Sequence, residues 1–151
     1  MKFLPLNRST APHFVERINK LRPDSQRLWG TMQPHQVAGH LKRSLEISLG
    51  EVEVTDKSNF LTRSALVKWL SFGPLPIPHN IKAPAYFFPS SYAEFATERD
   101  GLLATIPRYL DALEKTPDRL GPSELFGPMP LSYWSQIHGK HLDHHLRQFG
   151  C

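Results

Sequence analysis

The sequence predicts an all-α protein, a helical bundle with long Pro-rich loops. Apolar residues recur at helical spacing in several stretches, and strand signals are weak throughout. The chain has 14 prolines in 151 residues, many of them clustered between the periodic stretches. Hydrophobic residues make up 40% of the chain and charged residues 21%, which is typical of a globular protein. Because 151 residues is close to the usual size of one domain, we expect residues 1–151 to form a single domain.

The charge and cysteine content narrow the classes of partner. The formal net charge is +4, and the Lys and Arg residues are scattered without a long basic run, so a nucleic-acid partner is not expected. The stretch MKFLPL is too short for a signal peptide, and no segment approaches the roughly 20 apolar residues that span a bilayer, so no membrane is expected. The single cysteine, Cys151, permits no internal disulfide, which suits the reducing cytoplasm.

Five helices are expected. The first covers about residues 9–21, with Pro12 in its first turn, and the second about 31–50, with Thr31 as its cap and Pro34 in its first turn. Gly50 is a favourable C-terminal stop for the second helix. Its inward stripe comprises Val37, His40, Leu41, Ser44, Leu45 and Ser48.

The remaining elements are less regular. A third helix is expected over about 59–73, capped by Asn59, with its apolar side formed by Leu61, Leu66, Trp69 and Leu70. The Pro-rich segment 73–89 is expected to be an ordered, extended loop. A long helix over about 91–115, capped by Ser90 or Ser91, should be kinked or divided at Pro107. A loop over 116–130 precedes the last helix, 131–150, and Trp29 and Trp69 are expected to anchor the core.

The last helix carries the strongest chemical signal. At about 100° per residue, one face contains Trp134, Ile137, His141, His145 and Gln148. His141 and His145 are one turn apart, so both imidazoles can converge on one ion. His40, on the inward stripe of the second helix, is a candidate third ligand. Three neutral imidazoles suit Zn, Ni, Fe or Cu and leave a coordination position open.

Other interpretations of the histidines stay open. Histidines near a helix C-terminus also interact favourably with the helix dipole, and one inward histidine can be an ordinary hydrogen-bonded core residue. His138 and His144 lie at the edges of the inward face, where either would serve as a general base or lie on the surface. Gln148 is a candidate for hydrogen bonding to a ligand or to a bound water. Three isolated histidines, His13, His35 and His79, are expected on the surface or in loops.

Two segments give the sequence a family resemblance. WGTMQPHQVAGHLKRSLEISLG, residues 29–50, resembles the second helix of the DinB/YfiT-like superfamily, and HLDHHLRQFG, residues 141–150, resembles its closing H-x-x-H-H-x-x-Q helix. The segment GPLPIPHNIKAP and the terminal QFG are similar to one uncharacterised bacterial family within that superfamily. The resemblance extends over roughly residues 28–150, and the two histidine segments are its most specific part.

The resemblance implies an up-and-down four-helix bundle, often dimeric, in which His40, His141 and His145 bind a divalent transition metal such as Zn, Ni or Fe. It also implies a metal-dependent enzyme that transfers thiol groups with a low-molecular-weight thiol and a small-molecule substrate. A metal-dependent hydrolase and a non-catalytic metal-binding or interaction bundle are the alternatives. A thiol with carboxylates would need cationic groups in the pocket, for which Arg63 and Lys68 are the candidates. The catalytic residues are not assigned by the sequence.

Overall fold

The computed structural model describes residues 3–81 and 83–151, with side chains at all of these positions except 70–72. The chain is mostly helical, as the sequence predicts. Its helices are α1 (Ala11–Lys20), α2 (Pro34–Ser48), α3 (Ala65–Phe72), α4 (Phe95–Lys115) and α5 (Leu131–Gln148). A short 3-10 helix, η1 (Ala85–Phe87), precedes α4, and two short strands, β1 (Leu120–Gly121) and β2 (Met129–Pro130), precede α5.

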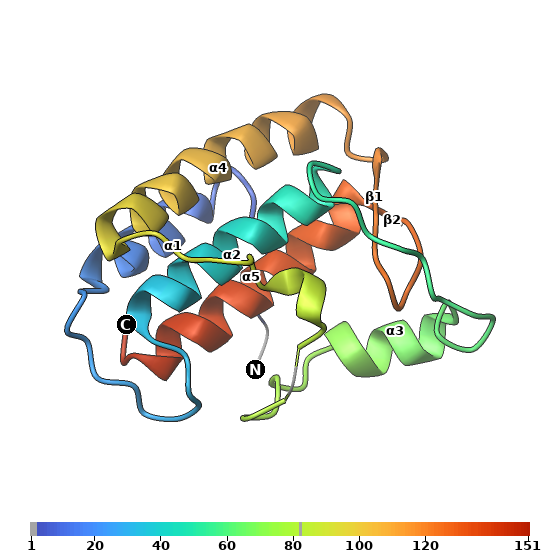
Figure 1. Ribbon diagram of the computed structural model, residues 1–151. Helices are drawn as coiled ribbons and strands as arrows, with labels where there is room; N and C mark the ends of the chain where they lie inside the picture. Colours follow the sequence, from blue (N-terminus) through green and yellow to red (C-terminus); the bar gives the residue numbers. More distant parts are fainter. Residues whose placement is uncertain (1–2, 82) are drawn as a thin grey trace.

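Four of the helices surround the hydrophobic core. Helix α2 packs against α4 and α5, α1 packs against the same two helices, and α4 also contacts α5 (Figure 1). Most of the deeply buried large side chains are contributed by α1, α2, α4 and α5, and Leu6, Leu21 and Met129 add to them from outside these helices. Helix α3 lies apart from this group and touches α5 alone among the other described elements. The inward stripe expected for α2 is buried along its whole length.

Local chemistry sets the helix ends. Pro34 occupies the first position of α2, where a missing N–H costs little. The prediction that Thr31 caps α2 is wrong. Gln33 is the cap residue, and its backbone N–H donates to the Gln36 side chain at 2.8 Å. The expected cap of α4 at Ser90 or Ser91 is also wrong, since Glu94 precedes the first helical residue. Pro107 lies inside α4 without dividing it into two helices.

Helix α3 differs most from the sequence-based expectation. Its cap residue is Ser64, whose hydroxyl accepts from the backbone N–H of Val67, whereas Asn59 caps only the turn before it. The apolar side chains Leu61, Leu66 and Trp69, expected to be inward, are more than half exposed, so Trp69 is not a core anchor. The fourth expected member, Leu70, lies outside the described side chains. Amphipathic spacing predicts a face but does not supply a neighbour to cover it.

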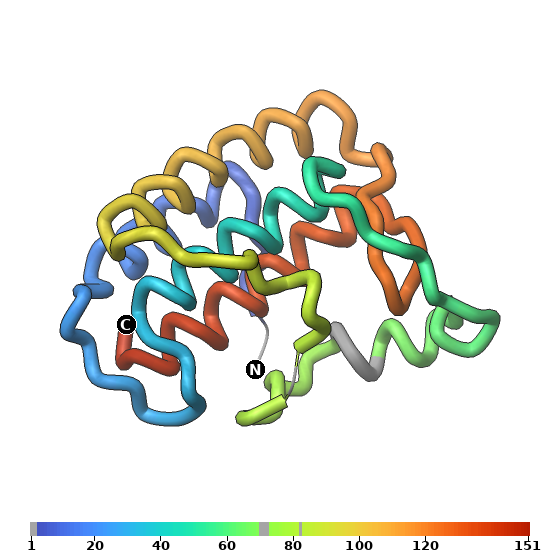
Figure 2. The backbone as a smooth tube through the Cα atoms, viewed as in Figure 1, coloured from blue at the N-terminus to red at the C-terminus, as the bar shows by residue number. Residues whose placement is uncertain are grey.

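The two irregular segments are ordered by contacts with the helices. After α3 the chain returns along α2, which η1 contacts, before α4 begins (Figure 2). The Arg43 side chain holds this segment by donating to the Tyr86 carbonyl at 2.6 Å. Strands β1 and β2 pair antiparallel, with Leu120 opposite Pro130 and Gly121 opposite Met129. These strands were not predicted, because two residues are too few to show the alternation of apolar and polar side chains that indicates a strand.

None of the helices described here is both long and apolar enough to cross a membrane.

Candidate metal centre

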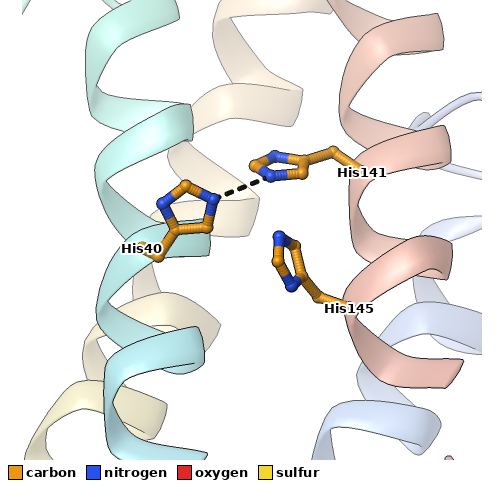
Figure 3. Close-up of side chains that lie close together, drawn as sticks. All are labelled: His40, His141 and His145. Atoms are coloured by element: carbon orange, nitrogen blue, oxygen red, sulfur yellow. Dashed lines mark hydrogen bonds between the residues drawn. The ribbon is translucent and has the colours of Figure 1, made fainter. Parts of the chain in front are cut away.

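Three histidines from two helices meet between α2 and α5. His40 projects from α2, and His141 and His145 project from successive turns of α5 toward it (Figure 3). The Nε2 atoms of His40 and His141 are 2.9 Å apart, and one ligand nitrogen from each of the three rings lies within 4.8 Å of the others. The structure therefore brings together the three residues that the sequence singled out.

Hydrogen bonds orient two of the three rings. His40 Nδ1 lies 3.2 Å from the Phe87 carbonyl oxygen, and His145 Nδ1 lies 3.0 Å from the Gln148 side-chain oxygen. Both oxygens are acceptors, so each Nδ1 carries the proton and each Nε2 keeps its lone pair. Gln148 is itself held in place, since its amide nitrogen donates to the Trp29 carbonyl at 2.7 Å. An imidazole whose outer nitrogen donates to a carbonyl oxygen is the arrangement found at metal ligands.

Burial keeps these imidazoles neutral. It lowers the pKa of His40 to about 4 and that of His145 to about 3, with the neighbouring His40 charge as a further cause for His145. The pKa of His141 is also well below its usual value, first through burial and then through His145 and His40. Neutral imidazole is the form that binds a metal, so no proton has to be displaced near neutral pH.

The nitrogen positions fit a transition metal. With metal–nitrogen bonds of about 2.0–2.1 Å and a tetrahedral angle, two ligand nitrogens are roughly 3.4 Å apart. The separations found here, from 2.9 Å to at most 4.8 Å, bracket that value. The donor set and its orientation therefore suit a divalent ion of the Zn, Ni, Fe or Cu type.

The three histidines line a pocket of about 840 Å³. The face of α5 that the sequence selected forms one wall, because all of its members line the pocket: Trp134, Ile137, His141, His145 and Gln148. The Pro-rich segment forms another wall, to which Ile77, Ile81, Phe87 and Phe88 contribute, and Phe126 and Met129 line the pocket from the segment that precedes α5. The ring of Phe88 stacks on His40 with centroids 5.1 Å apart. The site is thus at the wall of a mainly apolar pocket.

Charge is scarce in this pocket. As far as the structure describes its lining, no Lys, Arg, Asp or Glu contributes. Arg63, one candidate for binding a thiol's carboxylates, instead pairs with Asp56 at 2.7 Å outside the pocket. Lys68, the other candidate, is also not among the lining residues. The expected cationic groups are therefore not supplied by these two residues.

The two other histidines of α5 have different environments. His138 is buried in the core, where its Nε2 lies 2.8 Å from the Ser48 hydroxyl and its ring stacks on Trp134. It is neither a surface residue nor part of the pocket lining. His144 is half-buried and lines the pocket, with its ring 5.0 Å from that of His145.

Sequence reasoning missed the contribution of the Pro-rich segment. The Phe87 carbonyl and the Phe88 ring position His40, although they are 47 and 48 residues from it in the chain. Every residue has a backbone carbonyl, so the sequence does not indicate which one will accept a hydrogen bond. The aromatic pair Phe87–Phe88 is the one sequence feature that could have pointed to this segment. Trp29 was expected in the core, but it is half-buried and stacks on the exposed His79 with centroids 3.9 Å apart.

Comparisons with protein-family models, with curated proteins and with solved structures find no significant match to this chain.

Proposed function

We propose that this chain is a divalent-metal-dependent enzyme of the DinB/YfiT-like type, in which His40, His141 and His145 hold the metal. The observation that carries the proposal is the convergence of the three imidazoles within 4.8 Å at a pocket wall. The packing of α1, α2, α4 and α5 around one core supports the four-helix arrangement that the resemblance implies. A metal bound here would supply a Lewis acid that lowers the pKa of a coordinated thiol or water.

An open coordination position favours catalysis over a structural role. Structural zinc sites are closed by four protein ligands, whereas catalytic sites have three and leave one position free. Among the described residues, no fourth His, Cys, Asp or Glu joins the cluster. The pocket reaches the histidines from the remaining side, so a small molecule has room beside them. The non-catalytic alternative would need a fourth ligand from elsewhere.

The lining of the pocket suggests the class of substrate. Aromatic and aliphatic side chains dominate it, and they bind neutral, mainly apolar molecules better than ions. The leading reaction is transfer of a low-molecular-weight thiol to or from such a molecule, with the polar part of the thiol toward the solvent. Thiol transfer rests on the family resemblance, while the apolar pocket serves hydrolysis of a neutral substrate equally well. In the hydrolytic alternative, His144 is the pocket histidine placed to exchange a proton.

Metal analysis tests the site. Purified protein is expected to contain about one transition metal per chain, and His141→Ala or His145→Ala should remove it. His13→Ala is the matched control, because His13 is an exposed histidine of α1 and should leave the metal content unchanged. Full metal content in both α5 variants would refute the assignment. X-ray absorption of the loaded protein distinguishes three nitrogens and an open position from a closed four-ligand site.

Activity assays separate the candidate reactions. The metal-loaded protein is incubated with apolar electrophiles and a panel of low-molecular-weight thiols, and thiol consumption is measured. Consumption that disappears in His145→Ala supports transfer. Absence of consumption with every thiol, combined with cleavage of neutral esters or amides, would favour the hydrolase. Absence of both activities in fully loaded protein would favour the non-catalytic bundle.

A further inference from the structure

The 3-10 helix η1 presents two backbone carbonyls to α2. The carbonyls that begin this turn accept from backbone N–H groups within it, at 3.1 and 3.0 Å. The carbonyls of Tyr86 and Phe87 lie at its C-terminal end, where a helix supplies no backbone partner. Arg43 Nε donates to the first of them at 2.6 Å. His40 Nδ1 donates to the second at 3.2 Å, so side chains of α2 bind both carbonyls.

The bond from Arg43 is a tertiary constraint on η1. A single helical turn is not stable alone in water, because ordering its residues costs more than its few hydrogen bonds contribute. The half-buried Arg43 forms no ion pair with the carboxylates that the structure describes, so the Tyr86 carbonyl is the acceptor for its charged guanidinium. A hydrogen bond from a charged donor is about twice as strong as one from a neutral donor. Arg43 therefore fixes the end of η1 that faces α2.

The same end of η1 sets the direction of the His40 ring. The Phe87 carbonyl accepts from Nδ1, which leaves the lone pair of Nε2 for a metal. The ring of Phe88 stacks on the imidazole, with centroids 5.1 Å apart and planes 20° apart. Together these two contacts restrict rotation of the ring, on which the direction of Nε2 depends. Arg43 acts on both contacts, because it holds the carbonyl that directly precedes Phe87.

We propose that Arg43 is a positioning residue of the metal centre, which holds η1 on α2 so that Phe87 and Phe88 keep His40 directed at the metal. Arg43 and His40 are three residues apart, so they lie on the same side of α2. Arg43 is not among the described residues that line the pocket, so it acts through His40 and not on a substrate. The role rests on the proposed function, because it presupposes that His40 is a ligand.

Chelator competition with Zn²⁺ on the full chain tests this role. Arg43→Met keeps the length of the side chain up to Nε but removes the donor, so it should bind Zn²⁺ about tenfold more weakly than the wild type. Arg43→Gln has an amide N–H at the same number of bonds from the backbone as Nε, and it should recover most of the affinity. Arg43→Gln as weak as Arg43→Met would overturn the proposal, since the donor is then not the cause.

The matched control is Arg119→Met. Arg119 also donates to a backbone carbonyl, that of Leu49, and neither residue lines the pocket. The control should keep the wild-type affinity for Zn²⁺ even where it lowers the free energy of unfolding. A loss of affinity in the control as large as that in Arg43→Met would overturn the proposal, because general destabilisation would then explain both.

The tautomer of His40 provides a measurement that needs no metal. Nitrogen NMR of the metal-free protein should show His40 in the Nδ1–H form in the wild type and in Arg43→Gln, and a mixture of both tautomers in Arg43→Met. An unchanged tautomer in Arg43→Met, or an unchanged affinity for Zn²⁺, would overturn the proposal. A wild type that binds no Zn²⁺ would instead refute the proposed metal site, and the tautomer would still decide whether Arg43 orients His40.

Discussion

Acidification is expected to destabilise the metal-free protein steeply, and His138 permits a quantitative test. The side chain is buried to 2% exposure against Ser48, Tyr109 and Trp134, and burial lowers its pKa to about 3. An unfolded chain has a histidine pKa of about 6.5. Between these two values the unfolded state binds a proton that the folded state does not, so the free energy of unfolding falls as the pH falls.

The magnitude follows from the two pKa values. Consider a histidine that has a pKa of about 6.5 in the unfolded chain and stays neutral in the folded chain. Between pH 7.0 and pH 5.5 it lowers the free energy of unfolding by about 1.3 kcal/mol. His40 and His145, with pKa values of about 4 and 3, act in the same direction by about the same amount. The three residues together lower the free energy of unfolding by roughly 4 kcal/mol, which is a large part of a typical value of about 5–15 kcal/mol.

Urea unfolding at pH 7.0 and 5.5, with a chelator present, measures this loss. His138→Phe keeps a ring of similar size between Trp134 and Tyr109. The Ser48 hydroxyl also keeps its bond to the Leu45 carbonyl, so no buried group is left without a partner. The loss of stability on acidification should be smaller in this variant by about 1.3 kcal/mol. An equal loss in the variant and the wild type would refute the neutral, buried state of His138, and the exposed-site control His13→Gln should match the wild type.

Two further predictions address other contacts. Gln148→Leu removes the acceptor for His145 Nδ1, so the metal affinity measured by chelator competition should fall roughly 10- to 100-fold. Wild-type affinity in this variant would contradict the orienting role of Gln148. Gly139→Ala would bring a Cβ against the backbone carbonyl of Leu4, so it should lower the free energy of unfolding, measured by heat or urea, by about 1–3 kcal/mol. The control Gly101→Ala meets only a flexible lysine side chain and should be neutral or stabilising. Equal effects of the two changes would contradict the close packing at Gly139.

Much of the helical core is encoded locally. The inward stripes of α2 and α5 follow from residue spacing, because a period of 3.6 residues places Val37, Leu41 and Leu45 on one face whatever the neighbours are. The same spacing selected the wall of the pocket on α5. Residue type alone then made His141 and His145 a candidate pair, since two imidazoles one turn apart can share an ion.

The position of the third ligand and the form of the site depend on contacts between distant segments. His40 meets His141 only because α2 packs on α5, and its Nδ1 is oriented by the carbonyl of Phe87, a backbone group that no sequence pattern specifies. Conversely, spacing predicted a buried side for α3, yet Trp69 is more than half exposed, since α3 contacts α5 alone among the other described elements. Periodicity in the sequence thus determined which residues share a face, and tertiary packing alone decided what each face meets.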